Sequence, residues 1–171
     1  YLFNTRATPD DAYEFGKGKP LKHPLGETYQ LKRPLDFMSV TDHGFFMGSM
    51  MTMADKSHPL SKHPLARVVT DPDPKVVVTA FSAVIRGTLN GERINVGALA
   101  DREVQQDTWE KVIASANRHN DPGTFTTLIG YEWTSGSNGI NLHRNVIFRG
   151  DSAPLPFTRL HSQAPEDLWN W

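Results

Sequence analysis

One apolar run of strand length that leads into a carboxylate stands out in the sequence: Phe125-Thr126-Thr127-Leu128-Ile129-Gly130-Tyr131-Glu132-Trp133-Thr134. β-Branched and aromatic residues dominate the run, and this composition favours a buried strand. We expect the strand to cover 125–131 and to end just before Glu132. A Ser/Gly/Asn loop follows, and His143 lies just ahead of another apolar stretch, Asn145–Phe148, which we also interpret as a strand.

An earlier strand of the same kind is predicted at Leu35–Thr41, and it runs directly into Asp42-His43-Gly44. In α/β sheets and barrels, ligands bind where the carboxyl ends of the strands converge. His43 and Glu132 are therefore expected at one edge of the sheet, although they are far apart in the chain. His143 is expected in the loop that enters its strand, so it would reach this edge from the side.

Two helices are indicated between these strands. The first begins at Thr8, which can cap, with Pro9 at the first helical position, and it ends at Gly16 or Gly18. The second has a capping-box-like start at Asp107 and a stripe of apolar residues at helical spacing: Trp109, Val112, Ile113 and Ala116. Asp121-Pro122-Gly123 then forms a turn. Helix, turn and strand in alternation predict an α/β fold with a largely parallel sheet.

Other segments are less decisive. Residues 19–34 fit a loop or an irregular hairpin, Phe45–Met53 a helix or a flap, and 75–86 either a strand or a helix. The Gly87–Gly91 segment is interpreted as a turn. The chain starts at Tyr1 rather than Met, and residues 164–171 have the composition of the first turns of a helix. We therefore expect a fragment that is cut at both ends.

Composition excludes several classes of protein. The absence of cysteine excludes disulfides, cysteine nucleophiles and thiolate zinc sites. A net charge of −1, with no basic run interleaved with aromatics, argues against nucleic-acid binding. The apolar runs are of strand length, so no membrane span is expected. The sequence also contains neither a Gly-x-Ser-x-Gly elbow nor a Walker-type phosphate loop.

A chain without cysteine must build a metal site from His, Asp and Glu, and these ligands suit Zn, Mn or Fe. Bound ions of this kind can lower the pKa of a water molecule and clamp the oxygens of a phosphoester. His43, Glu132 and His143 are the candidate ligands. His58 and His63 are also tempting, but each precedes a proline in loop-like surroundings, and an extended loop residue is the preferred interpretation.

Several motifs of the chain resemble a known group of enzymes. Thr41-Asp42-His43 after one strand, Gly130-Tyr131-Glu132-Trp133-Thr134 after another, and His143 just before Val146-Ile147-Phe148 resemble the polymerase-and-histidinol-phosphatase (PHP) metallohydrolases. Four longer stretches are more closely similar to a bacterial family of unknown function related to the PHP enzymes: Arg6–Tyr13, Arg33–Phe37, Phe125–Trp133 and Asn141–Phe148. This similarity runs over most of the chain.

The resemblance implies an incomplete, distorted TIM-barrel-like PHP fold with largely parallel strands, in which residues 1–171 form part of the domain and its N- and C-terminal parts are missing. It implies two or three divalent metal ions in the complete site, with His43 and His143 as ligands and Glu132 as the bridging carboxylate. Asp42 would orient its neighbour or a bound water. Arg144 is our own candidate for a phosphate contact, because its planar donor fork suits an oxyanion.

The function expected from this resemblance is a metal-dependent hydrolase, in the first place a phosphoesterase that uses metal-activated water on a small, phosphorylated substrate. The fragment alone is expected to be inactive, because the opening His-x-His motif and the closing ligands of such enzymes are not in it. The resemblance slightly favours a periplasmic or secreted protein over a cytoplasmic one. Two alternatives stay open: hydrolysis of an ester, amide or phosphonate, and a non-catalytic binding domain that has lost its metals.

Overall fold

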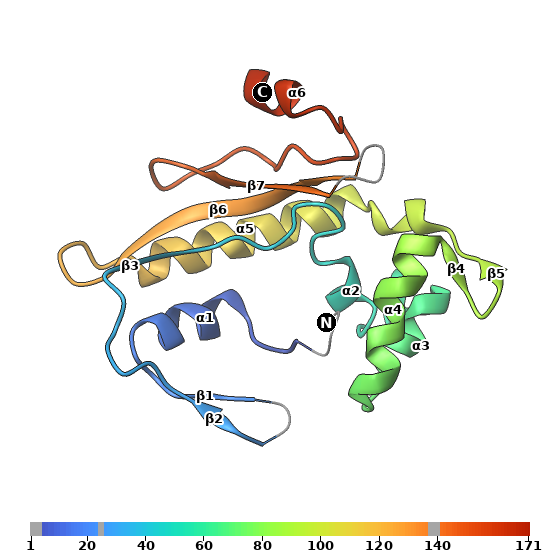
Figure 1. The fold of residues 1–171 in the computed structure, drawn as a ribbon, viewed down its shortest axis with the longest axis horizontal. Helices are drawn as coiled ribbons and strands as arrows, with labels where there is room; N and C mark the ends of the chain where they lie inside the picture. Colours follow the sequence, from blue (N-terminus) through green and yellow to red (C-terminus); the bar gives the residue numbers. More distant parts are fainter. Residues whose placement is uncertain (1–4, 24–25, 137–140) are drawn as a thin grey trace. The chain divides into compact units, whose positions relative to one another are not determined.

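The computed structural model describes residues 5–23, 26–136 and 141–171, and the chain divides into two compact units (Figure 1). One unit comprises Gly48–Gln105 with the N-terminal segment that ends at Arg6, and the other comprises Ala7–Met47 and Gln106–Trp171. We call them the helical unit and the sheet unit, and each is described by itself. None of the helices in the described ranges is both long enough and apolar enough to cross a bilayer.

The sheet unit is built on three strands in the order β3-β6-β7: β3 (Phe37–Val40), β6 (Thr126–Ser135) and β7 (Leu142–Ile147). β3 runs parallel to β6, with Phe37 opposite Thr126. β7 runs antiparallel to β6, with Gly130 opposite Ile147. The predicted strands therefore form, but in a small mixed sheet.

The predicted TIM-barrel-like PHP fold with largely parallel strands is wrong. The described strands form short sheets of mixed direction that do not close into a barrel. The connection between β6 and β7 explains the antiparallel pair, because residues 136–141 are enough for a hairpin, whereas a parallel return needs a crossover of roughly a dozen residues or more. β3 and β6 can run parallel because a long stretch of chain separates them.

Helix α1 (Pro9–Gly16) begins as predicted. Thr8 caps it in a reciprocal capping box with Asp11, and Pro9 takes the first helical position. After α1 in the chain, β1 (Leu21–Lys22) and β2 (Thr28–Tyr29) pair antiparallel as a two-stranded hairpin. The hairpin interpretation of residues 19–34 is therefore confirmed. Helix α6 (Pro165–Asn170) confirms the helix predicted after residue 164.

Helix α5 (Arg102–His119) begins before the predicted cap at Asp107. The side chain of Asp101 accepts the Val104 N–H at 3.1 Å, and five residues between Asp101 and Asp107, none of them Gly or Pro, let the helix begin a turn and a half earlier. The predicted stripe is confirmed. Trp109, Val112 and Ala116 are buried, and Ile113 packs at their margin.

The core of the sheet unit lies on one face of β6. Ile129, Tyr131 and Trp133 are buried there with the α5 stripe and Tyr13 of α1. These three residues of β6 are every second one along the strand, as expected for a strand with one covered face. The prediction that 35–41 form a buried strand is only half right, because Phe37 is 67% exposed and the rest of β3 is half-buried.

The helical unit contains residues 75–86 and most of Phe45–Met53, two of the segments whose structure the sequence left open. Its elements are α2 (Ser49–Thr52), two 3₁₀ turns (Pro59–Lys62 and Val96–Leu99), α3 (Pro64–Val69), α4 (Pro74–Arg86), β4 (Thr88–Leu89) and β5 (Glu92–Arg93). α4 settles 75–86 as a helix, capped by Asp73. The predicted turn is confirmed as the β4–β5 hairpin, in which Asn90 and Gly91 both have positive φ.

Candidate metal centre

The parallel pairing of β3 and β6 continues past the end of β3 and brings His43 beside Glu132. The two residues form an isolated parallel bridge in the register of the strands before it. The backbone is fixed on both sides of His43, because Glu132 N–H donates to the Asp42 carbonyl at 2.9 Å and Gly44 N–H donates to the Glu132 carbonyl at 2.9 Å.

The antiparallel pairing of β7 brings in His143 from the other side. His143 lies opposite Thr134, two residues beyond Glu132 on β6, so both side chains project from the same face of the sheet as Glu132. Two details of the sequence prediction are wrong: Glu132 lies inside its strand, and His143 belongs to β7 rather than to the loop before it. The sheet extends because Trp133-Thr134-Ser135 continues the pattern of strand-forming residues.

Together, His43, Glu132 and His143 form a cluster that we call the His-Glu-His cluster. One potential ligand atom from each residue lies within 4.8 Å of the other two. His43 Nδ1 is 3.7 Å from Glu132 Oε1, and His143 Nδ1 makes a hydrogen bond with the same oxygen. The three side chains are 48%, 21% and 42% exposed, respectively, so the face that carries them is open to solvent.

Thr134 lies between the two imidazoles and was missed by sequence reasoning. Its Oγ1 is 2.8 Å from His43 Nδ1 and 3.3 Å from His143 Nδ1, and the residue is 4% exposed. One buried hydroxyl therefore touches both rings and limits their rotation. The sequence could have indicated Thr134, because residues two positions apart on a strand point to the same face of the sheet, and Thr134 is two positions beyond Glu132.

The cluster fits a divalent ion. Two atoms that bind one ion at about 2.0–2.2 Å lie at most about 4.4 Å apart. The 3.7 Å separation of His43 Nδ1 and Glu132 Oε1 meets this limit directly, and the 4.8 Å envelope of the whole cluster needs only small side-chain adjustments. Two imidazoles and one carboxylate are a known three-ligand set for catalytic metal ions, which leaves coordination positions open.

Gly44 lets the chain pass tightly over the core directly after His43. A Cβ at this position would lie 2.8 Å from Cδ2 of Tyr131 and 3.3 Å from Cγ2 of Thr158. Tyr131 is held in turn, because its hydroxyl donates to the Phe157 carbonyl at 2.8 Å. Burial raises the pKa of Tyr131, which keeps this donor protonated. The backbone that carries His43 therefore rests on a fixed aromatic ring.

The other two predicted site residues do not join the cluster. Arg144 lies opposite Trp133, on the other face of the sheet, and its Nη1 donates to the carbonyl of His143 at 2.8 Å. The Asp42 carboxylate has no hydrogen-bond partner among the described residues, and only the backbone carbonyl of Asp42 contacts Glu132. The geometry gives no support to a role of either side chain at the cluster.

His58 and His63 have a structural role in the helical unit. Both are extended, as expected for residues before proline, and each side chain caps a helical turn: His58 Nδ1 accepts the Leu60 N–H and His63 Nδ1 accepts the Leu65 N–H, both at 3.2 Å. Both histidines therefore begin helical segments, whereas the sequence predicted that they lie in a loop. The His-Glu-His cluster is the one potential metal-binding group among the described residues, and it contains neither of these histidines.

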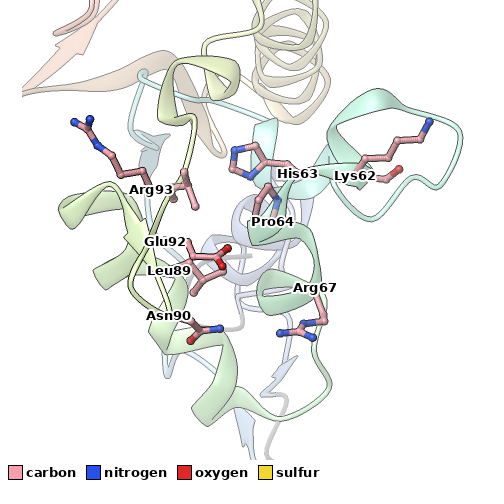
Figure 2. Close-up of a pocket in the computed structure, with 10 residues that line it drawn as sticks. Lys62, His63, Pro64, Arg67, Leu89, Asn90, Glu92 and Arg93 are labelled. Carbon is pink, nitrogen blue, oxygen red and sulfur yellow. The ribbon is translucent and has the colours of Figure 1, made fainter.

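A cavity of about 490 Å³ lies in the helical unit, between α3 and the β4–β5 hairpin. Figure 2 shows its lining, in which the side chains of Lys62 and Arg93 point away from the cavity. The charges at its wall are mixed, because Glu92 accompanies Arg67. The cavity contains no residue of the His-Glu-His cluster and no second group of metal ligands.

Comparison with known proteins identifies the family. The whole chain, residues 1–171, matches the family described as Protein of unknown function (DUF3604). The chain belongs to this family. No curated protein and no solved structure matches the DUF3604 chain. The predicted membership of a family of unknown function is thus confirmed, whereas no comparison links the chain to the PHP enzymes.

Proposed function

We propose that this DUF3604 chain carries a divalent-metal centre of a hydrolase, with phosphoesters as the first substrate class. The observation that carries the proposal is the convergence of Glu132 of β6, His143 of β7 and His43 of the bridge after β3 on one open face within 4.8 Å. Two histidines and a glutamate can leave a metal ion with open coordination positions, which is the property that separates catalytic from structural sites.

Each residue of the centre has a defined part. His43, Glu132 and His143 would hold an ion such as Zn, Mn or Fe, and the Thr134 hydroxyl orients both imidazoles. A divalent ion bound there supplies a nucleophilic water at neutral pH and a Lewis acid for the oxygen of the scissile group. A second or third ion needs further ligands, because three side chains can fill the coordination sphere of one ion only in part.

Phosphoesters are favoured over other bonds by two arguments. The motifs around Glu132 and His143 are similar in wording to those of the PHP phosphoesterases, and the cluster lies on an exposed face that an extended anionic substrate can reach. An ester, amide or phosphonate could use the same ligands.

Metal analysis of the purified full-length protein tests the proposal. We expect about one or more equivalents of a transition metal in the wild type, loss of the metal in Glu132→Gln, and full retention in Glu166→Gln, a control that alters an exposed carboxylate of α6. Hydrolysis of p-nitrophenyl phosphate and p-nitrophenyl acetate is then compared. A wild type without stoichiometric metal would refute the metal centre, and activity on the carboxyl ester alone would refute the phosphoesterase.

A further inference from the structure

A guanidinium group lies beside the His-Glu-His cluster, and no motif pointed to it. Gly136 directly follows β6 and is the next position after Glu132 and Thr134 in the alternating row. A Cβ on Gly136 would lie 2.8 Å from Nη2 and 3.3 Å from Nη1 of Arg159. The guanidinium of Arg159 therefore occupies the space that a side chain at Gly136 would need.

A second contact fixes Arg159 on the side of His43. Its Cζ lies 5.7 Å from the centre of the Phe45 ring, within cation–π range, and the Phe45 ring lies 5.4 Å from the ring of His43. The guanidinium is thus bounded by Gly136 after β6 and by Phe45 after β3. These two segments also carry two of the three ligands of the cluster, His43 and Glu132.

The loop that carries Arg159 is held in place by buried groups. Thr158 is 2% exposed, its N–H donates to His161 Nδ1 at 3.0 Å, and its Cγ2 lies against Gly44. At the far end of the loop, the Ser135 hydroxyl donates to the Gln163 carbonyl at 2.8 Å. This anchoring fixes the backbone at Arg159. The loop therefore loses little further conformational entropy when a ligand binds.

The charge of Arg159 is not neutralised within the described part of the chain, where no carboxylate lies within ion-pair distance of it. An aromatic ring satisfies one face of the guanidinium, but its N–H donors need acceptors. Two contacts link the guanidinium to the cluster: the Phe45 ring, which also lies beside His43, and Gly136, two residues beyond Thr134 in the chain.

We propose that Arg159 binds the phosphoryl oxygens of a phosphate monoester that the His-Glu-His cluster holds by its metal, with the Phe45 ring packed against both the guanidinium and His43. This inference rests on the proposed function. The planar fork of arginine can donate two parallel hydrogen bonds to a tetrahedral oxyanion. Arg159 thus takes the role that the sequence suggested for Arg144, and it confers a preference for doubly charged monoesters over uncharged esters.

Binding of inorganic phosphate to the metal-loaded full-length protein, measured by calorimetry, tests this role. We expect Arg159→Gln to weaken phosphate binding by about ten- to a hundred-fold, the usual range for a charge-assisted hydrogen-bond pair. Arg149→Gln, a control at an exposed arginine after β7, is expected to change it less than about two-fold. Metal content and melting temperature of both variants should equal those of the wild type.

The outcomes separate the two proposals. Full metal content with unchanged phosphate affinity in Arg159→Gln overturns the role of Arg159 and leaves the metal centre standing. A wild type without metal removes the metal centre and this inference with it. If Arg159→Gln does not fold, Arg159→Lys decides, because lysine keeps the charge and loses the fork: weaker phosphate binding supports the proposal, and unchanged binding overturns it.

Discussion

The two faces of β6 differ in what they carry. On the covered face, Ile129, Tyr131 and Trp133 are buried against α5 and α1. On the open face, Gly130, Glu132 and Thr134 alternate with them, and His43 from the segment after β3 and His143 from β7 lie beside Glu132 and Thr134. One face of β6 thus contributes to the hydrophobic core, and the other carries the polar side chains of the His-Glu-His cluster. Neighbouring residues should therefore respond to mutation in opposite ways.

The largest effect is expected on the covered face. Trp133→Ala removes a fully buried indole, and we expect it to lower the free energy of unfolding by about 3–5 kcal/mol, the range for large-to-small changes in a core. Urea unfolding followed by circular dichroism measures the loss. Glu132→Ala, one residue away, should change the free energy of unfolding by about 1 kcal/mol or less while abolishing metal binding. Similar losses of stability at both positions would contradict the division between the faces.

Gly44 connects the two faces, and its substitution should have an intermediate effect. Gly44→Ala places a methyl group 2.8 Å from the Tyr131 ring, and overpacking of this kind costs about 1–3 kcal/mol. Because the shift falls beside His43, metal affinity should also fall. Thermal unfolding and metal titration measure the two effects. Gly97→Ala is the control, because its new methyl group meets only the Asn95 Oδ1, at 3.3 Å rather than 2.8 Å. Equal behaviour of the two variants would show that Gly44 is not under steric constraint.

Local signals predicted much of the sheet unit. Thr8 and Pro9 mark the start of α1, the stripe from Trp109 to Ala116 marks the buried face of α5, and alternation marks β6. The expectation that His43 and Glu132 lie together also matches the geometry, although Glu132 lies inside β6 rather than at its end. The constant register of the parallel pair continues from Val40 to His43 and brings the two residues side by side. These features depend on residues close in sequence or on one general property of parallel strands.

The rest depends on pairings that local patterns do not specify. The direction of β7 was mispredicted because alternation is the same in parallel and antiparallel strands, and the barrel was expected from the resemblance alone. α4 stayed open because β-branched residues such as Val76 and Val77 suit either structure. Arg159 could not be found in the sequence, since its approach to Gly136 depends on how the loop around Thr158 docks.

A smaller effect is expected where α1 is joined to α5 on the covered face. The Asp10 carboxylate accepts hydrogen bonds from Ser115, Arg118 and His119 at 2.7–2.8 Å. Burial alone would raise the pKa of Asp10, but these hydrogen bonds outweigh it and lower the pKa below the ordinary value of 3.8. Asp10→Asn should cost about 1 kcal/mol or less, because nearly half of the Asp10 side chain is exposed to screening solvent.

The pH dependence of this loss has a definite sign. A carboxyl whose pKa is lowered by folding stabilises the protein above its unfolded pKa, and the contribution disappears as the pH falls through the folded value. The difference in unfolding free energy between wild type and Asp10→Asn should thus be constant at neutral pH and shrink below pH 3.8. Urea titrations across this range measure it. A difference that stays constant below pH 3.8 would contradict the assignment to Asp10.

The smallest effect is expected at Ser39, a residue of β3 on the open face. Its hydroxyl is buried without a hydrogen-bond partner in the described part of the chain, next to Gly130. An unsatisfied buried hydroxyl is unfavourable, so Ser39→Ala should leave stability unchanged or raise it by up to about 1 kcal/mol. Ser115→Ala, which removes a hydroxyl bonded to Asp10, should lower stability by about 1 kcal/mol. If Ser39→Ala is the destabilising variant, the hydroxyl has a partner, and the polar row of the open face extends beyond the His-Glu-His cluster along β3.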